Sequence, residues 1–394
     1  MITPETLIPL GLTFDDVLLV PRRTRARSRK DVDVSTQLTK QMSIKIPVIS
    51  ANTPWCTEAT MAIVMAKLGG IGIIHRMTTA EIQAALVEKV KNTVIDRSIF
   101  PLASVDANNL PLVGAAIGTK DDYLERAQQL VDYGVNILVV DIAHGHADYA
   151  LDAISKLKSL YPHVDIIGGN VATAEAVSDL IDAGADAIKV GIGPGAVCTT
   201  RLVAGAGVPQ LTAIIECATE ARKQGIPIIA DGGIRTSGDI AKAIAAGAST
   251  VMLGSMLAGT DESAAQLVER DGHLYKISTG FPSLGVELTL KQIRNEEITE
   301  DEVKEYVPEG VDATFEYKGS VADVLNQLIG GLRSGMSYSG SVSISEFWEQ
   351  ARFIQVTAAG QAENKPHIQT QNIQVHPDYR NLVAQKKTAQ NPVN

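Results

Sequence analysis

The chain has 394 residues, 45% of them hydrophobic, so it can bury a large core and could hold one to three domains. Its net charge is −10 and it contains no basic tract, which argues against nucleic acid or an anionic membrane surface as a partner. Three cysteines, Cys56, Cys198 and Cys217, are too few for a disulfide framework and form no Cys-x-x-Cys pair.

The N-terminus lacks a charged start followed by an apolar core, and the chain has no run of 18 apolar residues. The sequence therefore predicts neither a signal peptide nor a membrane span, and we expect a cytoplasmic protein. With so acidic a chain, an anionic substrate would have to be held locally, by backbone N–H groups of glycines and by single basic residues.

After an irregular start of about 45 residues, apolar strand-like runs alternate with amphipathic helix-like stretches. Aromatic residues make up only 4% of the chain, whereas small and branched residues abound, which is typical of helices packed on a parallel sheet. Strands are predicted at 47–51, 70–74, 112–117, 136–141, 164–168, 186–190, 227–231 and 249–254. Helices are predicted between them, for example at 57–68, 80–90, 121–133, 173–183, 210–223 and 237–246.

Eight βα units in about 250 residues predict an α/β fold of the (β/α)8 TIM-barrel type. An open doubly wound sheet is the alternative, but its glycine-rich turn would follow the first strand, whereas the richest turns here follow the sixth, seventh and eighth. The charge-dense stretch 293–305 cannot be core, so we expect a solvated excursion or a mobile flap at about 285–320. The last barrel helix is expected at 321–332 and a loose tail at about 369–394, all within one catalytic domain, 1–394.

Polar and glycine residues follow several predicted strands, at the barrel end where TIM barrels carry out their chemistry. Asp141 follows the fourth strand and Asn170 the fifth, while the turns Asp231–Arg235 and Gly254-Ser255 follow the last two. Two glycine turns that each lead into a helix predict a phosphate site, although either alone could be ordinary helix capping. His144 and His146, two residues apart and without carboxylate support, are interpreted as hydrogen-bonded loop residues rather than a metal pair.

The most informative stretch runs from Val190 to Arg201 and presents Cys198. Three glycines and a proline within six positions exclude a helix or the interior of a paired strand, so the backbone forms a tight loop that can approach a ligand closely. Hydroxyl residues and Arg201 flank the cysteine, an environment that favours the thiolate. The alternative is that Cys198 is a small buried filler.

These motifs resemble those of the IMP dehydrogenase / GMP reductase family. The resemblance covers nearly the whole barrel and rests on Phe14-Asp15-Asp16-Val17-Leu18-Leu19, Asp141 with Ala143-His144-Gly145-His146, Gly169-Asn170, Gly191 to Arg201, Ala230 to Arg235, and Gly330 to Ser334. It implies a reaction in which Cys198 attacks carbon 2 of a purine nucleotide, next to the hydroxyl of Thr200, and a hydride passes to a nicotinamide cofactor, NAD.

The resemblance also implies the binding residues. Those for the nucleotide would be Asn170, Asp231, Gly232, Gly233, Gly254, Ser255 and Gly280, and those for the cofactor Asp141, Gly191 and Gly193. A potassium ion would be held by backbone oxygens of Gly193, Gly195 and Cys198, with Glu363 contributed by a neighbouring subunit of a homotetramer.

Three features of the later sequence resemble the dehydrogenase more than the reductase. Gly280-Phe281-Pro282-Ser283-Leu284 lacks the glutamate that the reductase carries in Gly-Met-Ser-Ser-Glu. Arg294 falls at the flap arginine that activates water, although Asn295 replaces the tyrosine that usually follows, and Glu309 matches a proton-relay position. The favoured activity is the NAD-dependent oxidation of IMP to XMP; an NADPH-dependent GMP reductase and a diverged nucleotide-binding paralogue with weak or no activity are the alternatives.

The chain also departs from the family pattern. Thr53-Pro54 stands where the family has Met-Asp, Phe281-Pro282 where it has Met-Gly, and Ala196 and Ser278 where it has a serine and a tyrosine that hold phosphate. These changes leave open which purine nucleotide is preferred. The family's regulatory pair of CBS domains should interrupt the chain after the second strand, but only residues 91–110 lie there, so this module is expected to be absent.

Overall fold

The structure is a computed structural model that describes residues 8–120, 122–278, 311 and 313–364. The chain divides into two compact units, Met1–Gln355 and Val356–Asn394. The described part of the second unit contains the short helix α14 (Ala358–Glu363). The expected loose tail and most of the expected flap lie outside the described residues.

Eight parallel strands of the first unit close into a barrel, which confirms the predicted fold class. Each strand is hydrogen-bonded to the next one along the chain, and the last strand returns to the first, as in a (β/α)8 barrel. The strands are β4 (Val48–Ser50), β5 (Ile71–Ile74), β6 (Val113–Ile117), β7 (Ile137–Asp141), β8 (Asp165–Val171), β9 (Ala187–Val190), β10 (Ile228–Asp231) and β11 (Thr250–Leu253).

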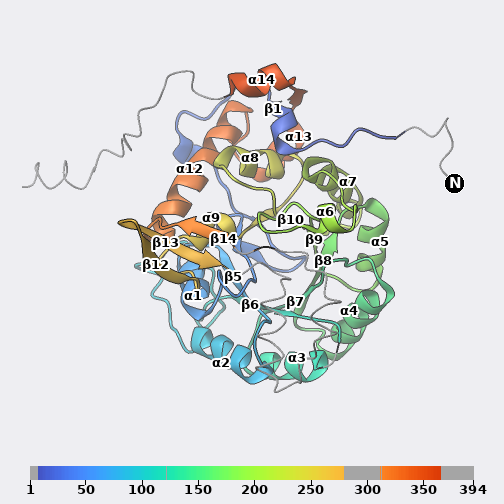
Figure 1. Cartoon of the computed structure of the whole chain (residues 1–394), viewed down its shortest axis with the longest axis vertical. Helices are drawn as coiled ribbons and strands as arrows, with labels where there is room; N and C mark the ends of the chain where they lie inside the picture. Colours follow the sequence, from blue (N-terminus) through green and yellow to red (C-terminus); the bar gives the residue numbers. More distant parts are fainter. Residues whose placement is uncertain (1–7, 121, 279–310, 312, 365–394) are drawn as a thin grey trace, which may run out of the picture. The chain divides into compact units, whose positions relative to one another are not determined.

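Helices connect these strands and surround the barrel (Figure 1). They are α1 (Ala59–Lys67), α2 (Ala80–Lys91), α3 (Tyr123–Asp132), α4 (Asp148–Leu160), α5 (Ala174–Asp182), α7 (Gln210–Arg222) and α8 (Ser237–Ala245), with the short α6 (Thr200–Val203) and α9 (Ser255–Ala258) at the barrel mouth. The last barrel helix, α12 (Val321–Tyr338), begins where predicted but is longer, because apolar residues continue to face the core as far as Met336.

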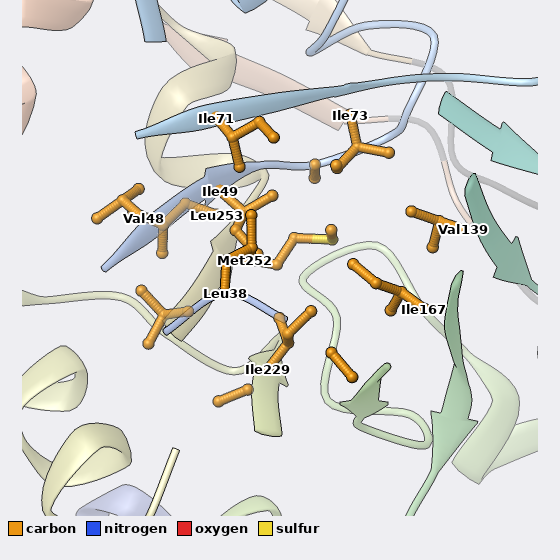
Figure 2. Close-up of a cluster of buried hydrophobic side chains, with 14 of the residues drawn as sticks. Leu38, Val48, Ile49, Ile71, Ile73, Val139, Ile167, Ile229, Met252 and Leu253 are labelled. Carbon is orange, nitrogen blue, oxygen red and sulfur yellow. The ribbon is translucent and has the colours of Figure 1, made fainter. Parts of the chain in front are cut away.

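The strands are buried on both faces, which is why they read as continuous apolar runs rather than alternating ones. Side chains that point inward fill the barrel, and those that point outward meet the helices. Leu38, which lies outside the barrel strands, belongs to the same buried hydrophobic cluster as Met252 of β11 (Figure 2). The cluster in that view also includes Ile49, Ile71, Ile73, Val139, Ile167 and Ile229.

Further elements lie outside the barrel repeat. Strands β1 (Val17–Leu19) and β15 (Phe353–Gln355) pair antiparallel, and β2 (Thr36–Gln37) pairs with β3 (Ser43–Ile44). Strands β12 (Gln266–Arg270) and β13 (His273–Ser278), which precede the expected flap, form a three-stranded sheet with β14 (Ala313–Glu316), which falls near its end. Helix α13 (Ile344–Gln350) follows α12, and short 3₁₀ turns occupy Phe14–Asp16 and Arg29–Asp31.

The connection between α2 and β6 has no room for a further domain, because only residues 92–112 lie between them. No CBS pair therefore interrupts the barrel at this place, in line with the short segment seen in the sequence. Among the helices that the structure describes, none is long and apolar enough to cross a membrane.

Gly72 of β5 allows helix α1 to lie directly on the barrel. A Cβ added there would lie 2.6 Å from the Cα and 2.8 Å from the Cβ of Ala62, whereas Gly330 in α12 has open space around it. We expect Gly72→Ala to lower the free energy of unfolding by about 1–3 kcal/mol through overpacking. Gly330→Ala should raise it by roughly 0.5–1 kcal/mol through helix propensity. Chemical denaturation of both variants tests this; equal effects of the same sign would contradict it.

Candidate functional site

A cavity of about 510 Å³ opens at the carboxyl ends of the barrel strands. The predicted site residues that line it are Asp141, Asn170, Gly191, Gly193, Gly195, Cys198, Thr200, Asp231, Gly232, Gly233, Gly254 and Ser255. They come from five different strand ends and are distant in the sequence, so the barrel brings them together as the fold prediction required.

Cys198 lies in the loop between β9 and α6 and is partly exposed. Its backbone N–H donates to the carbonyl of Gly195 over 3.1 Å, and its Sγ lies 3.2 Å from the Oγ1 of Thr200. The other two thiols are buried, and burial raises the pKa of Cys56 to about 11 and that of Cys217 to about 12. Cys198 is therefore the thiol placed to react with a ligand.

Arg201, which the sequence placed beside the thiol, braces the loop. Its Nε donates to the carbonyl of Ile192 over 3.1 Å, and its Nη2 donates to the carbonyl of Val208 over 2.6 Å. Its side chain also passes so close to Gly193 that a Cβ there would lie 2.5 Å from the Arg201 Cγ. The hydrogen bonds that the structure gives Arg201 thus fix the shape of the loop.

The glycines of the loop permit close contact with the neighbouring turn after β10. Gly191 has a φ of +152°, and a Cβ on it would lie 2.1 Å from the carbonyl oxygen of Asp231. Gly232, with a φ of +90°, faces the loop from the other side, where a Cβ would lie 3.1 Å from the backbone nitrogen of Gly195. Side chains at either position would push the cysteine loop away from the barrel.

Lys189 of β9 lies between two carboxylates at the bottom of the cavity. Its Nζ is 2.6 Å from Oδ1 of Asp141 and 2.6 Å from Oδ2 of Asp231, and its side chain is only 2% exposed. Burial by itself would lower the pKa of Lys189, but the two carboxylates outweigh it and raise the pKa above its usual value. Burial likewise acts to raise the pKa of Asp141, and Lys189, Asn52 and Arg76 overcome it and hold the pKa below its usual value.

Two asparagines extend this polar layer. Asn52 donates through Nδ2 to Oδ2 of Asp141 over 2.7 Å. Asn170 donates through Nδ2 to Oδ2 of Asp231 over 2.9 Å and to the carbonyl of Gly191 over 2.8 Å. The Oδ1 of Asn170 is buried and has no hydrogen-bond partner among the described residues.

The predicted phosphate turns lie at the rim. Gly233, with a φ of +77°, and Gly232 lead toward α8, where Thr236 and Asp239 form a capping box. Arg235 in the same turn makes a two-pronged ion pair with Asp15, at 2.9 Å and 2.6 Å. Asp15 of the N-terminal Phe-Asp-Asp motif therefore stabilises this turn through a charge-assisted hydrogen-bonded pair.

On the adjacent strand end, Trp55 lies across Gly254, where a Cβ would be 3.1 Å from the indole Cη2. Its ring also meets that of Phe315 in β14, with the centroids 5.5 Å apart. Trp55 both lines the cavity and belongs to the core. Two of the residues that depart from the family pattern, Thr53 and Ala196, also line the cavity.

His146 is hydrogen-bonded, as the sequence predicted for a loop residue, but its partner is a carboxylate, which the sequence analysis did not expect. The His146 Nε2 lies 2.7 Å from Oδ2 of Asp179. Within the described ranges, no group of three or more His, Cys, Asp or Glu residues could hold a metal ion.

Some predicted residues cannot be placed in the cavity. Gly280, Arg294 and Glu309 lie outside the described residues. Glu363 ends α14, in the second compact unit rather than in the unit that contains the barrel.

The sequence analysis did not single out three polar residues that line the cavity: Asn52, Arg76 and Lys189. Asn52 and Arg76 each lie two residues beyond a strand end, so the rule that barrel sites gather there could have found them. Lys189 gives a stronger signal, because it is a charged residue inside a strand that is buried on both faces. A lysine in such a place is almost always paired with opposite charge.

Comparison with known proteins points to one family. A sequence model of the IMP dehydrogenase / GMP reductase domain matches residues 11–367. The inosine-5′-monophosphate dehydrogenase of Nitrosopumilus maritimus is 38% identical, over 91% of this chain and 98% of that protein. The GMP reductase of Leishmania donovani is 39% identical, over 91% of this chain and 97% of that protein.

A solved structure is similar as well. It is a cysteine-to-alanine variant of the GMP reductase from Trypanosoma brucei in complex with guanosine 5′-monophosphate, with a TM-score of 0.86 and 36% identity, covering 92% of this chain and 98% of that one. Family model, relatives and fold agree over most of the chain, and the chain belongs to the IMP dehydrogenase / GMP reductase family of oxidoreductases.

Proposed function

We propose that the protein is an IMP dehydrogenase-like enzyme that oxidises IMP to XMP with NAD, through a covalent intermediate on Cys198. The observation that carries the proposal is the partly exposed Cys198 thiol, paired with Thr200 in the cavity at the barrel mouth. The dehydrogenase-like sequence of residues 280–309 supports oxidation as the direction.

The chemistry follows from the position of the thiol. The Cys198 thiolate would form a bond to carbon 2 of the purine, and the hydride on that carbon would leave. When bound, the nicotinamide ring accepts this hydride. Water would then add to the same carbon and break the bond to sulfur, giving XMP and the free thiol. IMP, NAD⁺ and water are thereby converted to XMP, NADH and a proton.

The cavity supports a nucleotide in one orientation. Asp231 would accept hydrogen bonds from the ribose hydroxyls, and Gly232, Gly233, Gly254 and Ser255 would surround the phosphate at the rim. This arrangement would direct the base toward Cys198 and Thr200. Asn170 and Gly280 complete the proposed substrate residues.

The residues present also fit a nicotinamide group. The buried Oδ1 of Asn170 is an acceptor without a partner among the described residues, and a carboxamide N–H₂ could donate to it. Asp141, Gly191 and Gly193 lie in the same cavity and would bound this part of the site.

For the remaining assignments the support is the sequence resemblance. Arg294 and Glu309 would activate water, and the protein would be a cytoplasmic homotetramer with one catalytic domain that includes a flap at about 285–320. Backbone oxygens of Gly193, Gly195 and Cys198, with Glu363 of a neighbouring subunit, would hold potassium.

GMP reductase, the NADPH-dependent conversion of GMP to IMP, is the second candidate. It is favoured by the similarity to the Trypanosoma brucei and Leishmania donovani GMP reductases and by the altered residues near the base and phosphate. Two assays separate the candidates: NADH formation with IMP and NAD, and NADPH consumption with GMP. NADPH consumption without NADH formation would reject the proposal in favour of the reductase, and neither reaction would favour a diverged nucleotide-binding paralogue.

Cys198→Ala is expected to reduce turnover by a factor of about 10³ or more, because the variant lacks the nucleophile that forms the covalent intermediate. Cys217→Ala is the matched control, because burial keeps that thiol protonated and it should retain most activity. Initial rates and mass spectrometry of the protein mixed with substrates check both points. An adduct on any other cysteine would contradict the mechanism.

Activity is expected to require a monovalent cation. The loop offers backbone oxygens, and no carboxylate or histidine cluster for a divalent metal exists among the described residues. Rates should be highest in potassium and should fall in sodium and lithium buffers of equal ionic strength. Equal rates in all three would remove the potassium site from the proposal.

Arg294→Ala is expected to spare the first hydride transfer and to slow steady turnover by roughly 10²-fold, within the range of a general acid–base group. The Cys198 adduct should then accumulate. Stopped-flow detection of NADH separates the burst from the steady state; loss of both together, or of neither, would contradict a role for Arg294 in hydrolysis.

A further inference from the structure

Lys189 occupies an unusual place for a charged residue. It is one of the largest fully buried side chains of the described chain, and its ammonium lies 2.6 Å from each of two carboxylates of the proposed site. We propose that Lys189 is a positioning residue whose ammonium keeps Asp141 and Asp231 close together and both ionised, so that Asp231 is ready to accept hydrogen bonds from a bound nucleotide. The inference deepens the proposed function and rests on it for the identity of the ligand.

The charges around Lys189 show why neutralisation matters. Asp141 faces it from β7 and Asp231 from β10, and Arg76, beyond the end of β5, acts on Asp141 from a greater range. Asn52 and Asn170 are neutral donors. Without the ammonium, two carboxylates would face the same buried point, and one of them would retain a proton because like charges this close cannot both ionise.

The hydrogen bonds of Asp231 show what its ionised state provides. Lys189 and Asn170 both donate to Oδ2, over 2.6 Å and 2.9 Å. Among the described residues, no side-chain donor engages Oδ1. An ionised carboxylate can only accept, so Oδ1 remains available to a ligand hydroxyl, whereas a protonated carboxyl would offer a donor in competition.

The neighbouring strand has space for the lysine. A Cβ added to Gly169 of β8 would lie 2.7 Å from the Cβ and 2.6 Å from the carbonyl oxygen of Lys189. Gly169 therefore leaves room for a long side chain that reaches the mouth of the barrel. A rival explanation is that the lysine stem merely fills this space, which an apolar side chain of similar length would do equally well.

The test uses Lys189→Met, which keeps the length but removes the charge, together with Asp141→Asn and the double variant. Without ligand, the pKa of one carboxyl in Lys189→Met should rise above its unfolded value, so stability should be lost as the pH rises through that higher pKa. As the pH rises above about 4, the unfolded pKa of an aspartate, the melting temperature of Lys189→Met should therefore fall more than that of the original protein. Asp141→Asn in the double variant should abolish the extra fall, since one carboxylate then remains.

IMP and GMP binding, measured by isothermal titration at about pH 7.5 in two buffers of different ionisation enthalpy, gives the second readout. Lys189→Met should bind about 10-fold more weakly or worse and should release a proton on binding, because only the ionised fraction is competent. The double variant should recover to within about 3-fold of the original protein, without that proton. Asp141→Asn alone measures the direct effect of losing that carboxylate on IMP and GMP affinity, and the double variant is judged against it.

Each outcome decides the matter. If Lys189→Met binds normally, or if the double variant does not recover, the lysine is not a charge-positioning residue. If Lys189→Met fails to fold but the double variant folds, the proposal is supported. If neither variant folds, Lys189 is required for packing and the proposal is wrong. If the original protein binds neither nucleotide, the proposed function is wrong. The ligand-free melting curves then still test whether Lys189 keeps both carboxylates ionised.

Discussion

The candidate site depends on one buried ion triad, in which Lys189 lies between Asp141 and Asp231. Burial of a lone lysine or a lone carboxylate at this depth would be costly, and the interaction becomes acceptable only when the charges face one another with further hydrogen bonds. Asn52 and Asn170 supply those bonds from other strand ends. The barrel therefore has an apolar interior, drawn in Figure 2, and a polar layer at its mouth that ties several of its strands together.

The cysteine loop is held against this layer by backbone contacts rather than by side chains. Gly191 lies against the Asp231 carbonyl, and Gly232 lies against Gly195. Gln210, at the start of α7, donates to the carbonyls of both Val190 and Asp231 and so links the two strand ends. The Cys198 thiol thus lies on a segment whose position is set by the barrel itself, which would provide the preorganisation that the proposed covalent catalysis needs.

Sequence reasoning identified the barrel because eight apolar runs and their helices have local signatures that survive without tertiary information. It predicted that Cys198, Asp141, Asn170 and Asp231 gather at one end of the barrel because they follow strand ends, and all four line the same cavity. It did not single out Lys189, because its two partners lie 48 and 42 positions away in the chain and the closed barrel brings them together. Phe281-Pro282, where the chain departs from the family pattern, lies outside the described residues.

The same reasoning explains why family membership is clear while the direction of the reaction rests on proposal. The polar layer and the cysteine loop would serve either an oxidation or a reduction, because both begin with a thiolate at carbon 2 and a nicotinamide group beside it. What differs is the group that leaves that carbon and whether water is activated afterwards. Those steps would fall to residues such as Arg294 and Glu309. Under the proposed function, the polar layer and the cysteine loop would therefore carry the shared chemistry, and the segment that contains Arg294 and Glu309 would decide between the two activities.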